Sequence, residues 1–356
     1  MTVSPSQPFS PPSSVLIIGS GVFGLSTALA LTRRDAFANC SITIVDRSDL
    51  SEDGTEFPSP DAASNDTSRI IRADYADPAY AALCDEAQVE WRKQDKPSDL
   101  GAEGRYNEAG LLLVGDHSSP AAVAAPAVEG AKPKRTGMDY ARMSWANVVS
   151  LAAKDPELAA RVRELPNPEA IREALGTGGT TGSWGYINNN SGWGNATKAM
   201  AWYLARVRET NRVTFISGTV LSLTHNSTST VTGAKLTDGR HLTADLTIVA
   251  AGAWTGGLVD LAGQAVATAQ VLGYIPLTPQ EQSFLSTMPV VLNLSTGLFI
   301  IPPTDNVLKI ARHAYGYTNP ITPLPHPPHH PVHPSLPQKR ISFPHLPHHP
   351  WPHNPR

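Results

Sequence analysis

The sequence predicts an α/β fold, and three features indicate it. A short apolar run at 15–18 is followed by a glycine turn and by a stretch with helical apolar spacing, and a second apolar run follows at 41–46. This strand–turn–helix–strand order defines a βαβ unit. From residue 261 to residue 314 the chain is instead rich in strands. We therefore expect one domain with a parallel sheet and a second domain with a mixed sheet.

The remaining elements follow from periodicity and from turn residues. Helices are expected at 78–93, at 155–174 with a break at Pro166, and at 195–210 with Asn195 as N-cap. The earlier strands are expected at 109–114, 212–216, 219–224, 231–237 and 246–254, with a turn at Asp238-Gly239. The later strands are expected at 271–277, 289–294, 297–303 and 306–313.

Composition narrows the class of protein. A length of 356 residues suggests roughly two domains, and 41% hydrophobic residues suffice for a core. The net charge of −3 disfavours nucleic acid and anionic membranes as partners. Two cysteines, Cys40 and Cys84, exclude a disulfide framework and a cysteine-rich zinc module. The sequence has no secretory signal and no apolar run of ~18 residues, so we expect a soluble, cytoplasmic protein, with a peroxisomal location as the alternative for a full-length form.

Composition and element order also suggest domain boundaries. We expect a nucleotide-binding domain formed by 14–75 and 190–260, and a substrate domain formed by 76–189 and 261–320. Residues 1–13 are expected to be disordered, and the Ala/Pro/Lys-rich stretch from Pro120 to Arg135 to form a surface loop.

The segment 321–356 differs sharply from the rest of the chain. It holds twelve of the 32 prolines and eight of the twelve histidines. Such frequent proline forbids helix and central strand, so a disordered or polyproline-like tail is expected. A histidine-rich tract can bind metal. Nothing in this one fixes three ligands in tetrahedral geometry, and we therefore expect no metal site.

The first motif is Gly19-x-Gly21-x-x-Gly24, placed between the first strand and the first helix. The first glycine permits the tight turn, the second lets the backbone approach a pyrophosphate, and the third lets the helix pack on the strand. Asp46 ends the second strand, where a carboxylate can accept hydrogen bonds from the adenosine ribose. The motif predicts a dinucleotide site without separating NAD from FAD.

The second motif is the apolar run from Ile248 that ends in Gly252 and Trp254. In flavoproteins with two dinucleotide-binding folds, a late strand returns to the first sheet and its glycine turn lies against the cofactor. A single-module NAD dehydrogenase needs no such return. The motif therefore favours FAD, although an ordinary buried strand followed by a turn also fits it.

The third motif, Asp66-Thr-Ser-Arg-Ile-Ile-Arg-Ala-Asp-Tyr75, places two arginines around two isoleucines. In an extended segment Arg69 and Arg72 point to opposite faces, whereas in a helical turn they share one face. A guanidinium binds a carboxylate through two parallel hydrogen bonds. A solvated pair of surface arginines fits the sequence equally well.

These motifs together carry a family resemblance. GSGVFGLSTALAL, DTSRIIRADYADPAY, IVAAGAW and NVLKIARHAYGYTNP, in this order, resemble the monomeric sarcosine oxidase family, and the run from 270 to 303 resembles its saccharopine oxidase and fructosyl-amino-acid oxidase branch. The resemblance covers 14–320. It implies a Rossmann-like, two-dinucleotide-fold FAD domain, a mixed-sheet substrate domain, and oxidation of a secondary amine on an amino acid, with dioxygen reduced to hydrogen peroxide.

The resemblance also implies roles for single residues. The FAD-binding residues are expected to be Gly19, Gly21, Gly24, Asp46 and Gly252. Arg69 resembles the arginine beside the flavin ring, and Arg72 the one that holds the substrate carboxylate. Lys309 resembles the lysine that promotes the reaction with dioxygen, where a fixed cation stabilises developing negative charge. His313 resembles an active-site histidine, and in a strand it shares a face with Lys309.

The chain departs from the family after Pro320. Members of this branch continue with a cysteine bonded to the flavin, a second glycine-rich flavin contact and another basic residue for the substrate carboxylate. Neither Cys40 nor Cys84 matches that cysteine, so we expect FAD to bind non-covalently. The change of composition at residue 320 suggests a truncated chain whose tail is translated non-coding or out-of-frame sequence.

Three functional hypotheses follow. The first is an FAD-dependent oxidase, expected as a monomer, that acts on a small amino-acid-derived secondary amine and dioxygen. The second is a truncated flavoprotein-fold fragment with weak activity or none. An NAD-dependent dehydrogenase ranks last, because it explains neither the late glycine strand nor the paired arginines.

Overall fold

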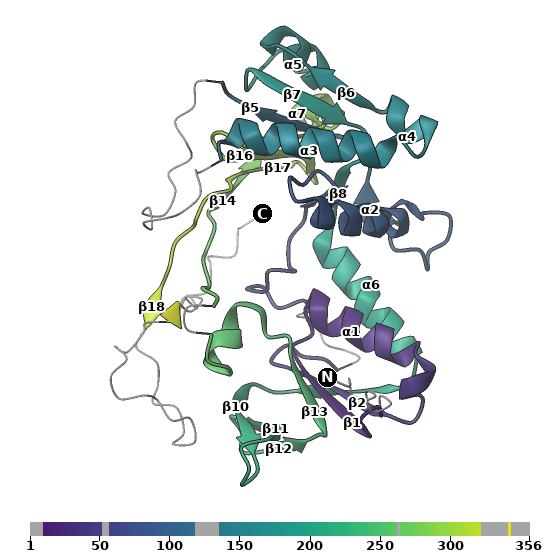
Figure 1. The fold of residues 1–356 in the computed structure, drawn as a ribbon, viewed down its shortest axis with the longest axis vertical. Coiled ribbons are helices and arrows are strands. Elements are labelled where there is room, and N and C mark those ends of the chain that lie inside the picture. Colours follow the sequence, from purple (N-terminus) through teal and green to yellow (C-terminus); the bar gives the residue numbers. More distant parts are fainter. Residues whose placement is uncertain (1–9, 52–56, 118–134, 262–263, 322–340, 343–356) are drawn as a thin grey trace, which may run out of the picture. The chain divides into compact units, whose positions relative to one another are not determined.

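A computed structural model describes residues 10–51, 57–117, 135–261, 264–321 and 341–342. The chain divides into two compact units (Figure 1). Unit 1 comprises Met1–Asn65, Met200–Thr268 and Thr318–Arg356, and unit 2 comprises Asp66–Ala199 and Ala269–Tyr317. The predicted ends 1–13 and 321–356 and the predicted loop at 120–135 lie largely outside the described residues, as does the histidine-rich tract.

Unit 1 is built on a parallel sheet of four strands in the order β13–β1–β2–β9. These strands are β1 (Ser14–Ile18), β2 (Ser41–Asp46), β9 (Val213–Ser217) and β13 (Leu246–Val249). Helix α1 (Val22–Thr32) and a 3-10 turn at Asp35–Phe37 join β1 to β2. The predicted βαβ unit is thereby confirmed.

Both faces of the unit 1 sheet are covered. One face packs under α1 and under the part of α6 (Ala196–Glu209) that begins at Met200, around Leu25, Ile42 and Ile44. The other face packs against an antiparallel sheet of β10 (Val220–His225), β11 (Val231–Leu236) and β12 (His241–Thr243). Unit 1 also contains the short pair β18 (Pro320–Ile321) and β19 (Ile341–Ser342).

Unit 2 contains a mixed sheet of seven strands in the order β14–β17–β16–β15–β5–β7–β6. Its strands, in chain order, are β5 (Leu111–Gly115), β6 (Val162–Leu165), β7 (Trp184–Asn188), β14 (Leu272–Pro276), β15 (Val290–Asn293), β16 (Leu298–Thr304) and β17 (Val307–Arg312). Only the β15–β5 pair is parallel among these neighbours. The predicted mixed sheet is confirmed.

Helices cover both faces of this mixed sheet. Helix α3 (Gly137–Ala152) packs over one face, around Leu111, Tyr186 and Ile301. Helices α5 (Pro168–Leu175) and α7 (Pro279–Leu285) pack over the other. Helix α2 (Pro78–Arg92), helix α4 (Pro156–Ala160) and a small sheet of β3 (Arg69–Ile71), β8 (Gly192–Gly194) and β4 (Tyr106–Asn107) complete the unit.

Several expectations differ from the structure. The helix predicted at 155–174 is two short helices with β6 between them, because β6 pairs with β7 and tertiary pairing outweighs local helix propensity. The domain boundaries also differ from the units of the structure. Residues 66–75 and 190–199 lie in unit 2, since β3 pairs with β8 there, and residues 261–268 and 318–320 lie in unit 1. Within the described part of the chain, no helix combines the length and apolar character needed to cross a membrane.

Candidate functional site

The glycine turn of unit 1 has the geometry that its motif predicts. Gly19 has φ +107°, a conformation that L side chains rarely adopt. A Cβ on Gly24 would lie 1.8 Å from the carbonyl oxygen of Gly19, so a side chain there would push α1 away from β1. Gly21 caps α1 without any side-chain hydrogen bond. The turn therefore brings the N-terminus of α1 close to the end of β1, which suits an anionic ligand.

Asp46 lies at the end of β2 and is half-buried. One of its carboxylate oxygens accepts a hydrogen bond from the Ser20 backbone N–H at 2.7 Å, and the other accepts one from the Ser48 N–H at 2.8 Å. Asp46 thus fixes the glycine turn directly. A carboxylate has about four acceptor sites, so these two bonds leave room for ribose hydroxyls.

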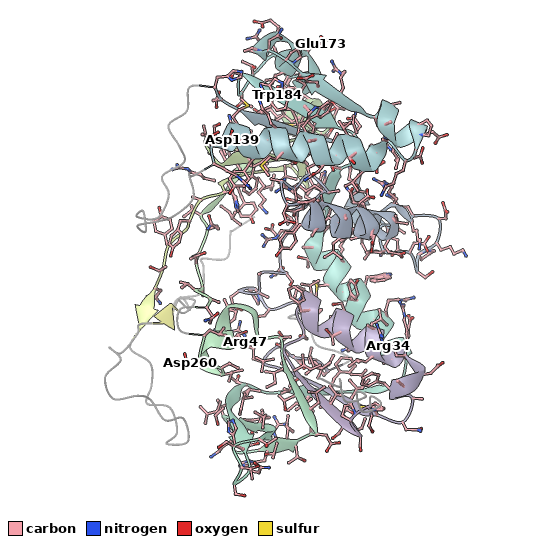
Figure 2. All side chains as sticks on the ribbon, viewed as in Figure 1. Arg34, Arg47, Asp139, Glu173, Trp184 and Asp260 are labelled. Carbon is pink, nitrogen blue, oxygen red and sulfur yellow. The ribbon has the colours of Figure 1, made fainter. Side chains whose placement is uncertain are left out.

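Three further residues near the turn were not identified from the sequence. The Ser64 hydroxyl accepts a hydrogen bond from the Val22 N–H, the first of α1, at 3.3 Å. Arg47, labelled in Figure 2, forms an ion pair with Asp61 and lies 4.0 Å from the centre of the Trp254 ring. An arginine directly after a strand-end acid, with an aromatic residue in a late glycine segment, is a signal that could have found this contact.

Gly252 lies beyond the strand that was expected to contain it. β13 ends at Val249 and is half-buried instead of fully buried, and Gly252 opens a 3-10 turn at Gly252–Gly257 with φ +54°. A Cβ on Gly252 would meet no atom of the described residues within 4 Å. Together with the glycine turn and Asp46, this open backbone fits a dinucleotide such as FAD.

The second group of site residues lies in unit 2 around Lys309. The Lys309 side chain is only 4% exposed. Its Nζ donates hydrogen bonds to a carboxylate oxygen of Asp66 at 2.5 Å and to the Ser68 carbonyl at 2.7 Å. Lys309 pairs with Ile301 on the neighbouring strand β16, and Ile301 belongs to the core under α3. Lys309 therefore lies on the face of the sheet that α3 covers. A solvent-facing strand lysine, the ordinary alternative for this residue, does not describe this position.

Asp66 joins Lys309 to two more polar side chains. The Tyr274 hydroxyl, on β14 directly opposite Lys309, donates to the second Asp66 oxygen at 3.1 Å. The Arg69 Nε lies 3.4 Å from the oxygen that Lys309 contacts. The sequence placed Asp66 at the start of a motif but gave it no role, because its partner Lys309 is 243 residues away.

The pKa of Lys309 lies below its ordinary value, because burial outweighs the opposing effect of Asp66. Burial lowers the pKa of Lys309, the hydrogen bond and charge of Asp66 raise it, and Arg69 lowers it. Burial, reinforced by Asp66, raises the pKa of Tyr274 to about 12, so its hydroxyl remains protonated at neutral pH. The carboxylate of Asp66 is therefore the group that favours a charged lysine in this cluster.

The two arginines of the third motif occupy different surroundings. Arg69 is half-buried on β3, which settles the open question of conformation in favour of the extended form. Arg72 follows the strand, donates a hydrogen bond to the carbonyl oxygen of Asp74, and lies 4.3 Å from the centre of the Tyr75 ring. The side chain of Asp74 is buried and accepts hydrogen bonds from Ser191 at 2.5 Å and Asn188 at 3.1 Å. Arg72 is thus held against a fixed stretch of backbone.

His313 is not brought to Lys309. β17 ends at Arg312, the His313 side chain is exposed, and its backbone N–H donates to the Gly297 carbonyl at 2.6 Å. Four residues of strand separate the two positions by ~13 Å. Ala311 alone continues the buried face of Lys309. The structure therefore shows His313 exposed just beyond the end of β17, and the pocket shared with Lys309 stays a prediction.

Comparison with known proteins identifies relatives that match most of the chain. The sequence pattern of the family described as FAD dependent oxidoreductase matches residues 14–341. The amino acid oxidase imqH of Aspergillus flavus is 33% identical over 332 residues, which cover 86% of this chain and 66% of the relative. The amino acid oxidase fsqB of Aspergillus fumigatus is 32% identical over 324 residues, which cover 85% and 62%. This chain therefore spans slightly under two thirds of the length of these relatives.

A more distant relative and two solved structures also match this chain. The L-saccharopine oxidase of Schizosaccharomyces pombe is 23% identical over 315 residues, covering 85% of this chain and 66% of the relative. The crystal structure of fructosyl amine: oxygen oxidoreductase (Amadoriase I) from Aspergillus fumigatus matches with a TM-score of 0.65 at 26% identity, covering 96% of this chain and 69% of that chain. The structure of fructosyl peptide oxidase from E. terrenum, with a TM-score of 0.70 at 23% identity and coverages of 93% and 69%, shares the fold.

Proposed function

The chain belongs to the FAD-dependent oxidoreductase family, and we propose that it is an FAD-dependent oxidase of a secondary amine carried by an amino acid. The resemblance predicted from its motifs is confirmed at the level of the family. The observation that carries the proposed activity is the buried Lys309, held by Asp66 on the face of the mixed sheet. Its relatives named amino acid oxidase and L-saccharopine oxidase support a substrate with an amino-acid carboxylate.

We assign roles to residues on this basis. Unit 1 would hold FAD through Gly19, Gly21, Gly24, Asp46 and Gly252, and unit 2 would bind the substrate. Bound FAD supplies a hydride acceptor for the α-carbon of the amine and returns the two electrons to dioxygen, which gives an imine and hydrogen peroxide.

The side chains of unit 2 would act around this chemistry. Arg72 would bind the substrate carboxylate, and Arg69 would place a positive charge beside the flavin ring. Lys309 would supply a fixed cation where dioxygen gains negative charge. His313 remains a residue proposed from the resemblance alone, since its exposed position supplies no contact to Lys309.

The direct test is an absorbance spectrum of the purified chain, followed by an assay for hydrogen peroxide with saccharopine, fructosyl amino acids and sarcosine. We expect a flavin spectrum and peroxide from at least one of these amines. A colourless protein that produces no peroxide after FAD is added would contradict the proposal. That outcome would support the alternative, a flavoprotein-fold fragment with weak activity or none.

We expect any bound FAD to be non-covalent. Cys40 is buried in the core of unit 1, and Cys84 is half-buried on α2. Neither matches the flavin-linked cysteine of the resembled branch. Acid precipitation should therefore release all flavin into the supernatant, where its absorbance measures it. Flavin that remains with the precipitate would show that one of these thiols forms the bond.

The Asp46→Ala variant should bind FAD about ten- to a hundred-fold more weakly, because a hydrogen bond to a charged group contributes roughly 1.5–3 kcal/mol. The loss includes the support that Asp46 gives to the glycine turn through Ser20. Fluorescence titration of FAD into the apoprotein measures the dissociation constant. Asp238→Ala removes an exposed acid from a β-turn of the same unit and should change nothing. Equal constants for Asp46→Ala and the unchanged chain would contradict the ribose assignment.

A further inference from the structure

Asp66 is the point at which three separate segments of unit 2 meet. Its side chain is 1% exposed, and it contacts Lys309 of β17, Tyr274 of β14 and Arg69 of β3. The Ser68 N–H also approaches the same carboxylate at 3.4 Å. These contacts compensate the cost of burying the Asp66 carboxylate, because a buried charge is tolerated only when it is paired and hydrogen-bonded.

We propose that Asp66 is a positioning residue that keeps Lys309 protonated and fixes its ammonium group in place. This proposal rests on the proposed function, in which Lys309 acts as a cation during the reaction with dioxygen. It adds a requirement that the function alone does not contain. A lysine buried on an apolar sheet face works as a cation only while a carboxylate compensates its charge.

The geometry supports a specific role for the pair. An ammonium group has three N–H donors. Within the part of the chain that the structure describes, Lys309 uses two of them, toward Asp66 and the Ser68 carbonyl. These two bonds anchor the amine to the 66–68 segment and leave the third donor for a bound molecule. Asp66 thereby fixes the direction of that donor as well as the charge behind it.

Without Asp66, the remaining surroundings of Lys309 would all lower its pKa or leave it unchanged. Burial disfavours the charged form of Lys309, and Arg69 is a second cation close by. Tyr274 stays neutral at pH 7, so it offers Lys309 no charge in place of the carboxylate. Asp66 is the one acidic group that hydrogen-bonds Lys309 among the described residues. Asp66→Asn should therefore lower the pKa of Lys309.

The decisive measurement is a pH titration of lysine side chains by NMR, with the ε-carbons labelled with carbon-13. The Lys309 signal is assigned by its loss in Lys309→Met. We expect its transition to move down by at least about one pH unit in Asp66→Asn, because an opposite charge within ~4–6 Å shifts a pKa by 1–3 units. Asp66→Glu keeps the negative charge, so its Lys309 transition should lie close to that of the unchanged chain. The measurement needs no substrate and no turnover.

A matched control is available on α2. Glu90 and Lys93 form an exposed ion pair at 2.6 Å, with both side chains more than half exposed. Glu90→Gln should move the Lys93 transition very little, because solvent screens an exposed pair. An unchanged Lys309 transition in Asp66→Asn would overturn the proposal. So would a shift no larger than that of Lys93 in Glu90→Gln.

A second arm tests the pairing through stability if Asp66→Asn is too unstable for the NMR titration. Removing one partner of a buried ion pair leaves an uncompensated charge, whereas removing both does not. The double variant Asp66→Asn/Lys309→Met should therefore recover melting temperature relative to Asp66→Asn alone. A double variant as unstable as the single one would show that Asp66 does not act through Lys309.

The oxidase reaction separates this proposal from the function on which it rests. In Asp66→Asn the pH above which the reaction with dioxygen slows should move down together with the Lys309 transition, so that the rate recovers as pH falls, while Lys309→Met stays slow at every pH. A purely structural role for Asp66 would give no recovery at low pH, and that result would overturn the proposal. If the NMR shift occurs but Lys309→Met reacts normally with dioxygen, the pairing stands and the oxidase role of Lys309 fails.

Discussion

Lys309→Met is expected to slow the reaction of the reduced enzyme with dioxygen about a hundred- to a thousand-fold, the typical effect of removing one well-placed electrostatic stabiliser. Methionine keeps the length and the apolar stem of lysine but removes the charge. That charge acts mainly when dioxygen accepts the first electron, so reduction by the amine under anaerobic conditions should change much less. The loss of rate should therefore fall on the reoxidation half-reaction, in which dioxygen is reduced.

The surroundings of Lys309 make this substitution interpretable. Asp66 keeps its hydrogen bond from Tyr274 and its contact with Arg69 when the lysine is removed, so its carboxylate is not left unpaired. Rapid-mixing absorbance at the oxidised flavin band measures both half-reactions. Lys198→Met, an exposed lysine at the start of α6, is the matched control and should leave both unchanged. If reoxidation is unchanged in Lys309→Met, Lys309 has no role in the reaction with dioxygen.

The glycine turn of unit 1 could be predicted because its constraints are local. The positive φ of Gly19 and the close approach at Gly24 concern atoms within a few residues of one another, and glycine is the residue that such geometry requires. The apolar run before the turn and the helical spacing of apolar residues after it predicted the flanking strand and helix. Local rules of this kind are legible in a single sequence.

The Lys309 cluster could not be predicted in the same way. The sequence suggested Lys309 and Arg69 through a family resemblance, but the contact of Lys309 with Asp66 spans 243 residues and depends on how β14 and β17 pair. The same limit explains β6, whose residues carry a helical pattern and pair with β7 instead. Helix α3 is a different case, since the capping box of Thr136 and Asp139 was present in the sequence and was overlooked.

Arg72→Ala is expected to act on the opposite half-reaction from Lys309→Met. If Arg72 holds the substrate carboxylate, its loss should weaken substrate binding by about 2–5 kcal/mol, on the order of 30-fold or more in affinity, because a desolvated carboxylate loses its charged partner. Reduction by the amine should slow accordingly at low substrate concentration. Reoxidation by dioxygen should stay near normal, since no substrate carboxylate takes part in it.

The contacts of Arg72 restrict the direction of its guanidinium group. One guanidinium nitrogen donates to the Asp74 carbonyl and the plane lies over Tyr75, while the Asp74 side chain is locked by Ser191 and Asn188. Arg72→Lys keeps the charge but loses the two-pronged geometry, so it should recover only part of the affinity. Arg163→Ala, an exposed arginine on β6, is the control. Rapid mixing at several substrate concentrations gives the dissociation constant, and a value equal to that of the unchanged enzyme would show that another residue binds the carboxylate.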